Sequence, residues 1–258
     1  MSTDGLLVNR IQFKTINEMF NLENKYNIFA GPCAIESLEQ MEEVARVLVF
    51  NNVKFIRGGA YKPRTSPYDF QGLGLEGLEI LDYVRKKYNL LAVSEIMDPR
   101  DVEYGLVYTD IIQIGSRNMQ NFSLLKEVGK TQHPVLLKRG MMSTVKEFLL
   151  AAEYIVSNGN ENIILCERGI RTFEDSTRNT LDISCIAIVK HDTSLPIIAD
   201  LSHSLGRKDI IQLISKSLYA MGCDGIMLEV HPNPPVALSD SAQQLNFEEF
   251  KAVVDTYT

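Results

Sequence analysis

Several features that would assign the chain to a common class of protein are missing from it. The longest apolar runs are only as long as a strand, so we expect no segment to span a membrane. The N-terminal residues do not combine a basic region with a long apolar segment, so we expect no signal peptide. The four cysteines lack the paired spacing of a disulfide framework, which favours free thiols and the reducing cytoplasm.

An excess of positive charge is missing as well. The formal net charge of −7 argues against nucleic acid as the main partner. It does not argue against small anionic substrates, because a local cluster of Arg and Lys can focus positive potential inside an acidic protein. The 258 residues, 45% of them hydrophobic, are enough for one sizeable core, and barrel folds commonly reach this length as one unit.

Short apolar runs rich in β-formers recur along the chain at fairly regular intervals. There are eight, at 27–31, 54–57, 91–95, 111–115, 134–138, 162–166, 195–200 and 225–230. Helical periodicity lies between them, over 39–50, 74–88, 99–107, 122–129, 144–157, 182–190 and 207–221, and a last helix is expected over 246–257. Strands that alternate with helices imply parallel pairing, and eight such units predict a single (β/α)₈ barrel.

The main alternative is a doubly wound sheet, which would carry a glycine-rich dinucleotide fingerprint after its first strand. That turn instead reads Ala-Gly-Pro-Cys-Ala-Ile-Glu-Ser, so the barrel is favoured. We expect residues 27–258 to form the catalytic barrel and residues 1–26 to form an N-terminal extension. Within the extension, residues 6–13 could make a short strand or hairpin that covers the barrel floor.

The second predicted strand leads into a loop rich in hydrogen-bond donors. Gly58 and Gly59 let the backbone approach a ligand closely. Lys62 and Arg64 flank a stiff proline, and hydroxyls follow at Thr65 and Ser66. Such a set of donors suits a phosphate or a carboxylate.

Catalytic groups of a barrel lie at the C-terminal ends of its strands. Almost every predicted strand ends in a chemically useful residue: Cys33; Arg57 with Lys62 and Arg64; Glu95; Arg117; Lys138 and Arg139; Glu167, Arg168 and Arg171; Asp200 and His203; Glu229 and His231. Any one of these could be an ordinary solvated side chain. Their convergence on one rim favours a site, and the cations are numerous enough for two phosphorylated ligands.

A second group on the same rim has a different chemistry. Cys33, His203, Glu229 and Asp240 offer a thiolate, an imidazole and two carboxylates, a mixed set that suits a divalent transition ion. The four residues are far apart in sequence, so spacing alone does not establish the site. Taken singly, Cys33 could be a small buried hydrophobic residue and His203 an ordinary loop histidine.

With these segments in view, the chain resembles the 3-deoxy-D-arabino-heptulosonate 7-phosphate (DAHP) synthases, in their compact microbial, type I-beta-like form. The match is carried by GPCAIES (31–37), RGGAYKPRTSPYDFQGLG (57–74), SEIMDPRD (94–101), QIGSRNMQN (113–121), LLKRGM (136–141), ILCERGIRTFE (164–174), RNTLD (178–182), DLSHSLG (200–206) and MLEVHP (227–232), with Ser239-Asp240 beyond. These motifs cover nearly the whole barrel.

The resemblance implies a reaction and a role for each residue. Phosphoenolpyruvate, erythrose 4-phosphate and water would give the seven-carbon sugar acid phosphate and inorganic phosphate, the first step of the shikimate pathway. One divalent ion of the Mn, Fe, Co or Zn class would be held by Cys33, His203, Glu229 and Asp240. Phosphoenolpyruvate would be held by Arg57, Arg117, Lys138 and Arg168, and the aldose phosphate by Arg64 and Thr65.

Two residues remain as candidates for proton transfer. We expect Lys62 to reach the reacting centre and to protonate the aldehyde oxygen. Glu95 is the candidate for accepting the proton of the attacking water, although a purely structural carboxylate on the rim would fit the sequence equally well. Departures from the family pattern around His203, at Leu201, Ser204 and Leu205, and after Asp240, at Ser241, leave the ligand side chains in place.

Two alternative functions remain. The related 3-deoxy-manno-octulosonate 8-phosphate synthases use arabinose 5-phosphate, but there we would expect Lys-Ala-Asn-Arg-Ser-Ser where this chain has Lys62-Pro63-Arg64-Thr65-Ser66. A non-catalytic barrel that senses a phosphorylated metabolite would need the arginines but not the metal ligands.

The resemblance also implies a homodimer or a homotetramer. A fused regulatory domain is not expected, because 26 residues before the first strand are too few to build one. We therefore expect no feedback inhibition by phenylalanine or tyrosine through such a domain, although a separate partner chain could still regulate the enzyme.

Overall fold

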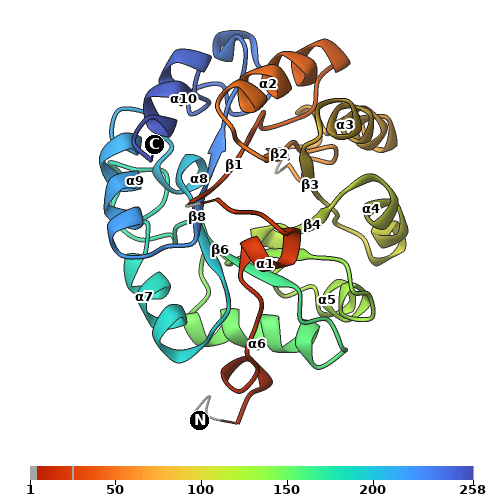
Figure 1. Ribbon diagram of the computed structural model, residues 1–258, viewed down its shortest axis with the longest axis vertical. Coiled ribbons are helices and arrows are strands. Elements are labelled where there is room, and N and C mark those ends of the chain that lie inside the picture. The colour runs from red at the N-terminus through yellow and green to blue at the C-terminus, as the bar shows by residue number, and fades with distance from the viewer. Residues whose placement is uncertain (1–4, 25, 65, 258) are drawn as a thin grey trace.

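The computed structural model describes residues 5–24, 26–64 and 66–257, and within them the sheet is a closed barrel of parallel strands (Figure 1). The strands follow chain order: β1 (Asn27–Gly31), β2 (Phe55–Arg57), β3 (Leu91–Glu95), β4 (Ile111–Ile114), β5 (Val135–Lys138), β6 (Ile163–Glu167), β7 (Ile197–Asp200) and β8 (Gly225–Glu229). β8 pairs with β1 and closes the barrel. The prediction of a (β/α)₈ barrel is therefore confirmed.

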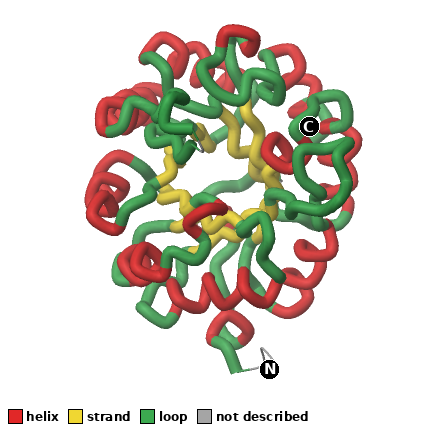
Figure 2. Tube along the Cα trace, turned by 180° about the vertical axis from the view of Figure 1, so that it is seen from behind, coloured by secondary structure: helices red, strands yellow, loops and turns green. Residues whose placement is uncertain are grey.

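The helices surround the strands, as the outer ring in Figure 2 shows. They are α1 (Ile16–Phe20), α2 (Leu38–Phe50), α3 (Leu75–Tyr88), α4 (Val102–Tyr108), α5 (Phe122–Gly129), α6 (Val145–Val156), α7 (Ile183–Asp192), α8 (Leu201–Leu205), α9 (Ile211–Ala220) and α10 (Phe247–Val254). Short 3₁₀ helices lie at Leu7–Asn9, Pro99–Asp101, Ser116–Asn118 and Pro234–Val236. α8 was not expected from the sequence; it lies directly after β7.

Both faces of the strands are buried, which is why the strands read as continuous apolar runs rather than alternating ones. Alternate residues point into the barrel, where Phe29 and Phe55 stack with ring centroids 4.2 Å apart and pack with Ile198 and Met227. The residues between them, such as Ala30, pack against the surrounding helices. Two hydrophobic clusters, one inside and one outside the barrel wall, hold the rim in a fixed shape.

The expected strand or hairpin over residues 6–13 is wrong, because no strand lies within the described residues 5–24. The amides of Leu7 and Val8 instead donate to the carboxylate of Glu153 on α6, both at 3.0 Å, so this segment packs beside α6. α1 lies across the barrel opening (Figure 1), and its Ile16 joins the interior cluster. The floor is therefore covered by a helix, which begins with a capping box between Thr15 and Glu18.

Gly31 at the end of β1 is required by a close approach of two strands. Its φ is +153°, and a Cβ built there would lie 1.9 Å from the carbonyl oxygen of Arg57. We expect Gly31→Ala to lower the free energy of unfolding by at least about 2 kcal/mol, since the backbone oxygen cannot move aside. Urea unfolding measures this. Gly5→Ala is the control, because a Cβ at Gly5 meets nothing within 4 Å; equal stability of the two variants would contradict the prediction.

Candidate functional site

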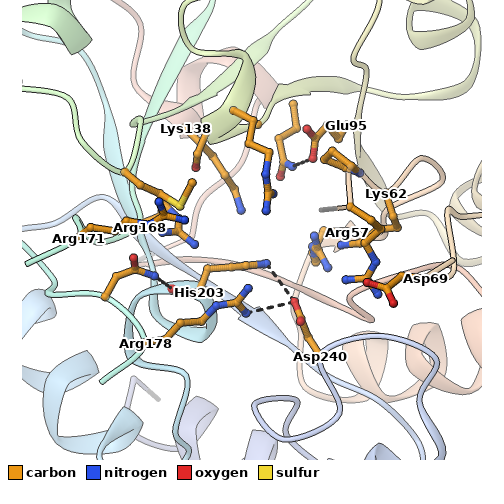
Figure 3. A pocket seen from close by; sticks show the side chains of 18 residues that line it. Arg57, Lys62, Asp69, Glu95, Lys138, Arg168, Arg171, Arg178, His203 and Asp240 are labelled. Carbon is orange, nitrogen blue, oxygen red and sulfur yellow. Dashed lines mark hydrogen bonds and ion pairs between the residues drawn. The ribbon is translucent and has the colours of Figure 1, made fainter. Parts of the chain in front are cut away.

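A cavity of about 360 Å³ opens at the C-terminal ends of the strands (Figure 3). This volume suits one or two small molecules. Its lining, among the described residues, includes eight cationic side chains: Arg57, Lys62, Arg64, Arg117, Lys138, Arg168, Arg171 and Arg178. Three carboxylates, Asp69, Glu95 and Asp240, also line it. The cavity is thus a strongly positive site inside an acidic protein, as expected for anionic ligands.

The structure brings together the four residues predicted as metal ligands. One ligand atom from each of Cys33, His203, Glu229 and Asp240 lies within 4.8 Å of the others. The Sγ of Cys33 is 3.4 Å from Oδ2 of Asp240, and Nε2 of His203 is 3.4 Å from Oε1 of Glu229. The pairing of β1 with β8, in which Gly31 lies opposite Glu229, sets the first and last strand ends side by side.

The donor chemistry fits a single transition ion. One sulfur, one nitrogen and two carboxylate oxygens form a mixed set that prefers such ions to Mg²⁺ or Ca²⁺. Burial raises the pKa of the Cys33 thiol to about 12, and the Glu229 carboxylate adds to the effect. A cation bound beside the sulfur would offset both, since metal ligation deprotonates a thiol.

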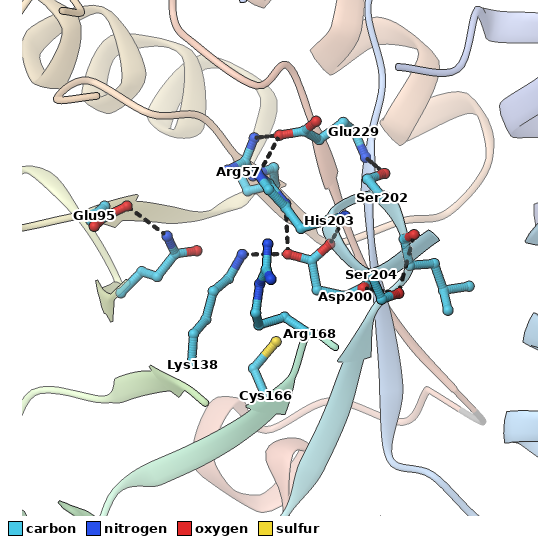
Figure 4. A network of polar contacts seen from close by, with 12 residues as sticks. Arg57, Glu95, Lys138, Cys166, Arg168, Asp200, Ser202, His203, Ser204 and Glu229 are labelled. Atoms are coloured by element: carbon cyan, nitrogen blue, oxygen red, sulfur yellow. Dashed lines mark hydrogen bonds and ion pairs between the residues drawn. The ribbon is translucent and has the colours of Figure 1, made fainter. Parts of the chain in front are cut away.

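His203 is held in the tautomer that a metal site requires. Its Nδ1 lies 2.8 Å from Oδ2 of Asp200, whose other oxygen caps α8 by accepting the backbone amide of His203 (Figure 4). Burial would raise the pKa of Asp200, but His203 and Lys138 outweigh it and hold that pKa well below its usual value. An ionised carboxylate only accepts, so in the neutral imidazole Nδ1 carries the proton and Nε2, 3.4 Å from Oε1 of Glu229, keeps its lone pair.

Asp200 also forms an ion pair with Lys138, so one buried carboxylate contacts both a proposed metal ligand and a cation of the pocket. Burial lowers the pKa of His203, which favours the neutral imidazole that binds metals. The sequence placed Asp200 on the rim but indicated no role for it. Its position three residues before His203, at a helix N-cap, is the signal that could have found one.

Two cations, Arg57 at the end of β2 and Lys62 in the loop after it, lie directly against two of the four ligand residues. The Nζ of Lys62 is 3.0 Å from Sγ and 3.1 Å from the carbonyl oxygen of Cys33, and Arg57 Nη1 is 3.4 Å from Glu229 Oε1. Burial would lower the pKa of Lys62, but Cys33 and Glu229 outweigh it and raise that pKa, so the amine stays protonated. Arg64 is half-buried and donates to the carbonyl oxygen of Phe70. Thr65, predicted beside it, lies outside the described residues.

Glu95 is the carboxylate at the end of β3 and lines the same cavity. Its Oε2 accepts from Gln113 at 3.4 Å, while its Oε1 is buried without a hydrogen-bond partner. A Cβ at Gly115 would lie 2.0 Å from Oε1, so glycine is what leaves room for the carboxylate. A buried oxygen without a partner, in a polar cavity, can accept a hydrogen bond from a bound molecule.

Some rim residues do not reach the cavity. Arg139 forms ion pairs at 2.8 Å with both Glu167 and Asp182, which places it in the wall between β6 and α7. His231 lies 3.5 Å from Glu36, away from the cavity lining.

Arg178 belongs to the RNTLD motif but was assigned no role from the sequence; its Nη1 lies 3.2 Å from Oδ2 of Asp240. Arg178 lies in the long loop after β6, ten residues beyond Arg168, so it could not be identified from the position where the strand ends. All four cysteines are buried and free of disulfide bonds. Among the described residues, no helix is long and apolar enough to cross a membrane.

Comparison with known proteins agrees with this geometry. The profile of the DAHP synthetase I family matches residues 12–258. The phospho-2-dehydro-3-deoxyheptonate aldolase of Thermotoga maritima is 54% identical over 229 residues, which are 89% of this chain and 68% of that protein. The 2-dehydro-3-deoxyphosphooctonate aldolase of Acidithiobacillus ferrooxidans (strain ATCC 53993) is more distant, at 28% identity over 85% of this chain and 83% of its own length.

Solved structures give the same result. The crystal structure of the Thermotoga maritima DAHP synthase superposes with a TM-score of 0.86 at 53% identity, over 89% of this chain and 67% of that one. A truncated form of the Thermotoga maritima enzyme gives a TM-score of 0.83 at 51% identity, over 89% and 84% of the two chains. The chain belongs to the DAHP synthetase I family.

Proposed function

We propose that the protein condenses phosphoenolpyruvate with erythrose 4-phosphate and water to give DAHP and inorganic phosphate, the first step of the shikimate pathway. The observation that carries this proposal is the contact between the two halves of the site. Lys62, in the cationic loop, lies 3.0 Å from the sulfur of Cys33, so the anion pocket and the four ligand residues face one reacting centre. The name of the 54% identical relative supports the same reaction.

The metal centre is part of this proposal. Cys33, His203, Glu229 and Asp240 would hold one divalent ion of the Mn, Fe, Co or Zn class. When bound, such an ion supplies Lewis-acid polarisation of a carbonyl oxygen.

The cationic side chains would divide between the two substrates. Arg57, Arg117, Lys138 and Arg168 would hold the carboxylate and phosphate of phosphoenolpyruvate, because the guanidinium groups match both anions with paired hydrogen bonds and the ammonium of Lys138 adds a positive point charge. Arg64 and Thr65 would hold the phosphate of the aldose. The burial of Arg57, Lys138 and Arg168 supports the first assignment, since charges withdrawn from water are pre-positioned and interact strongly.

The proton transfers follow from the remaining groups. The enol carbon of phosphoenolpyruvate attacks the aldehyde carbon, and the protonated amine of Lys62 donates its proton to the aldehyde oxygen. Water then attacks the cationic carbon that results, and Glu95 accepts one proton of that water through its unpartnered Oε1. Phosphate leaves with cleavage of its C–O bond and takes the remaining hydroxyl proton, so that the carbon becomes the carbonyl of the product, and the proton on Glu95 balances the one that Lys62 gave up.

A choice between aldoses tests the proposal against its nearest alternative. We expect kcat/KM for erythrose 4-phosphate to exceed that for arabinose 5-phosphate by at least about tenfold, because Pro63-Arg64 replaces the Ala-Asn expected in octulosonate synthases. Phosphate release with each aldose, with and without chelator, measures this. A preference for arabinose 5-phosphate would favour the octulosonate reaction, and no release with either would favour a binding protein.

Two further expectations complete the proposal. Four free cysteines support a cytoplasmic location, which fractionation of the source cells would test. We also propose that the protein forms a homodimer or a homotetramer. Light scattering measures the mass, and a monomer would contradict the proposal. A separate regulatory chain could bind either oligomer.

A further inference from the structure

We propose that two adjacent buried glutamines, Gln243 and Gln244, are positioning residues that hold three of the four proposed metal ligands in place. Both precede α10 and follow the loop that carries Asp240. They are 4% and 0% exposed, and neither was singled out by its sequence context. The inference rests on the proposed metal centre but concerns side chains outside the ligand set.

Gln244 ties the loop of Cys33 to the loop of Asp240. Its Oε1 accepts the backbone amide of Cys33 at 3.0 Å, and its Nε2 donates to the carbonyl oxygen of Ser239 at 2.8 Å. Ser239 directly precedes Asp240, whose Oδ2 lies 3.4 Å from the sulfur of Cys33. One fully buried amide therefore spans two segments separated by more than 200 residues and sets two ligand atoms side by side.

Gln243 holds Glu229, the proposed metal ligand at the end of β8. Its Nε2 donates to Oε2 of Glu229 at 2.6 Å, which leaves Oε1 of that carboxylate facing Nε2 of His203. Its Oε1 accepts from Nη1 of Arg178 at 2.7 Å, and the same Nη1 lies 3.2 Å from Oδ2 of Asp240. Gln243 thus orients Glu229 directly and Asp240 through Arg178.

The backbone explains how two neighbours reach different ligands. The amide of Leu245 donates to the carbonyl oxygen of Glu229, and the amide of His231 donates to the carbonyl oxygen of Leu245. Leu245 therefore forms a short parallel bridge with Val230, directly after β8. Gln243 lies in the turn after Asp240, where its amide donates to the carbonyl oxygen of Asp240, whereas Gln244 lies past that turn and directly before the bridge, so the two side chains leave the backbone from different surroundings. Asp240 itself has a φ of +46°, a conformation that costs energy in a residue other than glycine and persists where neighbours hold it.

The chemistry of the site requires an amide at both positions. Each glutamine donates one hydrogen bond and accepts another, which a carboxylate cannot do. Glutamate at 243 would place a second negative charge against Glu229, and glutamate at 244 would set a carboxylate against the carbonyl oxygen of Ser239. Methionine has a similar length but would leave the buried partners without hydrogen bonds.

The test uses Gln243→Glu, Gln244→Glu, Gln243→Met and Gln244→Met. Gln132→Glu is the matched control, because Gln132 is exposed and its Nε2 bonds to Gly159 near the N-terminal ends of the strands. Metal-free protein is titrated with Co²⁺ in competition with a coloured chelator, and thiolate-to-cobalt charge-transfer absorption reports ligation by Cys33. We expect Co²⁺ to bind about 10- to 100-fold more weakly to the four variants than to the wild-type protein. The control variant should bind Co²⁺ with wild-type affinity. The Gln244 variants should also lose charge-transfer intensity.

Circular dichroism and thermal unfolding of the metal-free proteins show whether each variant folds, and the Met variants decide the question where a Glu variant does not. Wild-type affinity and an unchanged absorption band in the folded variants would overturn the inference. Failure of all four variants to fold would overturn it as well, because the glutamines would then be needed for the fold itself. Absence of a thiolate band in the wild-type protein would instead refute the proposed metal centre.

Discussion

Cys33→Ala is expected to abolish metal-dependent turnover while the barrel stays folded. Cys33 is fully buried, and its Sγ contributes the only sulfur among the four clustered ligand residues. Loss of groups that merely orient ligands typically costs about 10- to 100-fold in affinity or activity, so loss of a ligand should cost more than about 100-fold. Metal content after dialysis and phosphate release from both substrates measure the effect.

Cys223→Ala is the matched control for this variant. Cys223 is also buried and free, but it precedes β8 at the opposite end of the barrel, where its Sγ donates to carbonyl oxygens of Ile197 and Gly225. We expect it to keep metal content and turnover, with at most a modest loss of stability. Full activity of Cys33→Ala after chelation and metal add-back would refute the assignment of the centre.

Lys62→Met is expected to lower kcat by about 10²- to 10⁴-fold, the usual contribution of a positioned proton donor. Lys62 is 8% exposed, lines the cavity and stays protonated beside Cys33, so it is positioned to donate a proton at the reacting centre. We expect KM to change much less than kcat, because the arginines that would bind the two substrates remain. Steady-state phosphate release with both substrates varied separates the two parameters.

The variant also removes a cation from the sulfur of Cys33, so its metal content has to be measured together with its activity. Lys54→Met is the control, since Lys54 is exposed and precedes β2 at the other end of the same strand. An unaltered kcat in Lys62→Met at wild-type metal content would rule out proton donation by this residue.

The sequence alone predicted the barrel and which residues lie at its rim. Parallel strands buried on both faces appear as uninterrupted apolar runs, so the eight strands could be recognised to within two residues of their ends. Because functional groups of a barrel lie where its strands end, the residues after those runs could be identified as rim residues before any contact was known. Residue type then separated the cations from Cys33, His203, Glu229 and Asp240. Of the residues predicted for the site, only Thr65 lies outside the described part of the chain.

Other features depended on contacts between distant segments. The sequence did not show that residues 6–13 pack against α6 and that a helix covers the floor, because Glu153, which binds Leu7 and Val8, is more than 140 residues away. Nor did it show that Arg139 turns into the barrel wall, since its partners are Glu167 and Asp182. A charged side chain at a strand end can face either way, and its partners decide which.

What the sequence determined by itself was the fold class, the rim and the chemical type of each group on it, because these depend on local periodicity and on residue identity. What only the tertiary structure decided was the geometry that makes those groups one site. Pairing of β1 with β8 sets the strand ends that carry Cys33 and Glu229 side by side, and Gln244 accepts the backbone amide of Cys33 from 211 positions away. A hydrogen bond between residues 200 positions apart leaves no periodic trace in the sequence, so it becomes visible only when the barrel has closed.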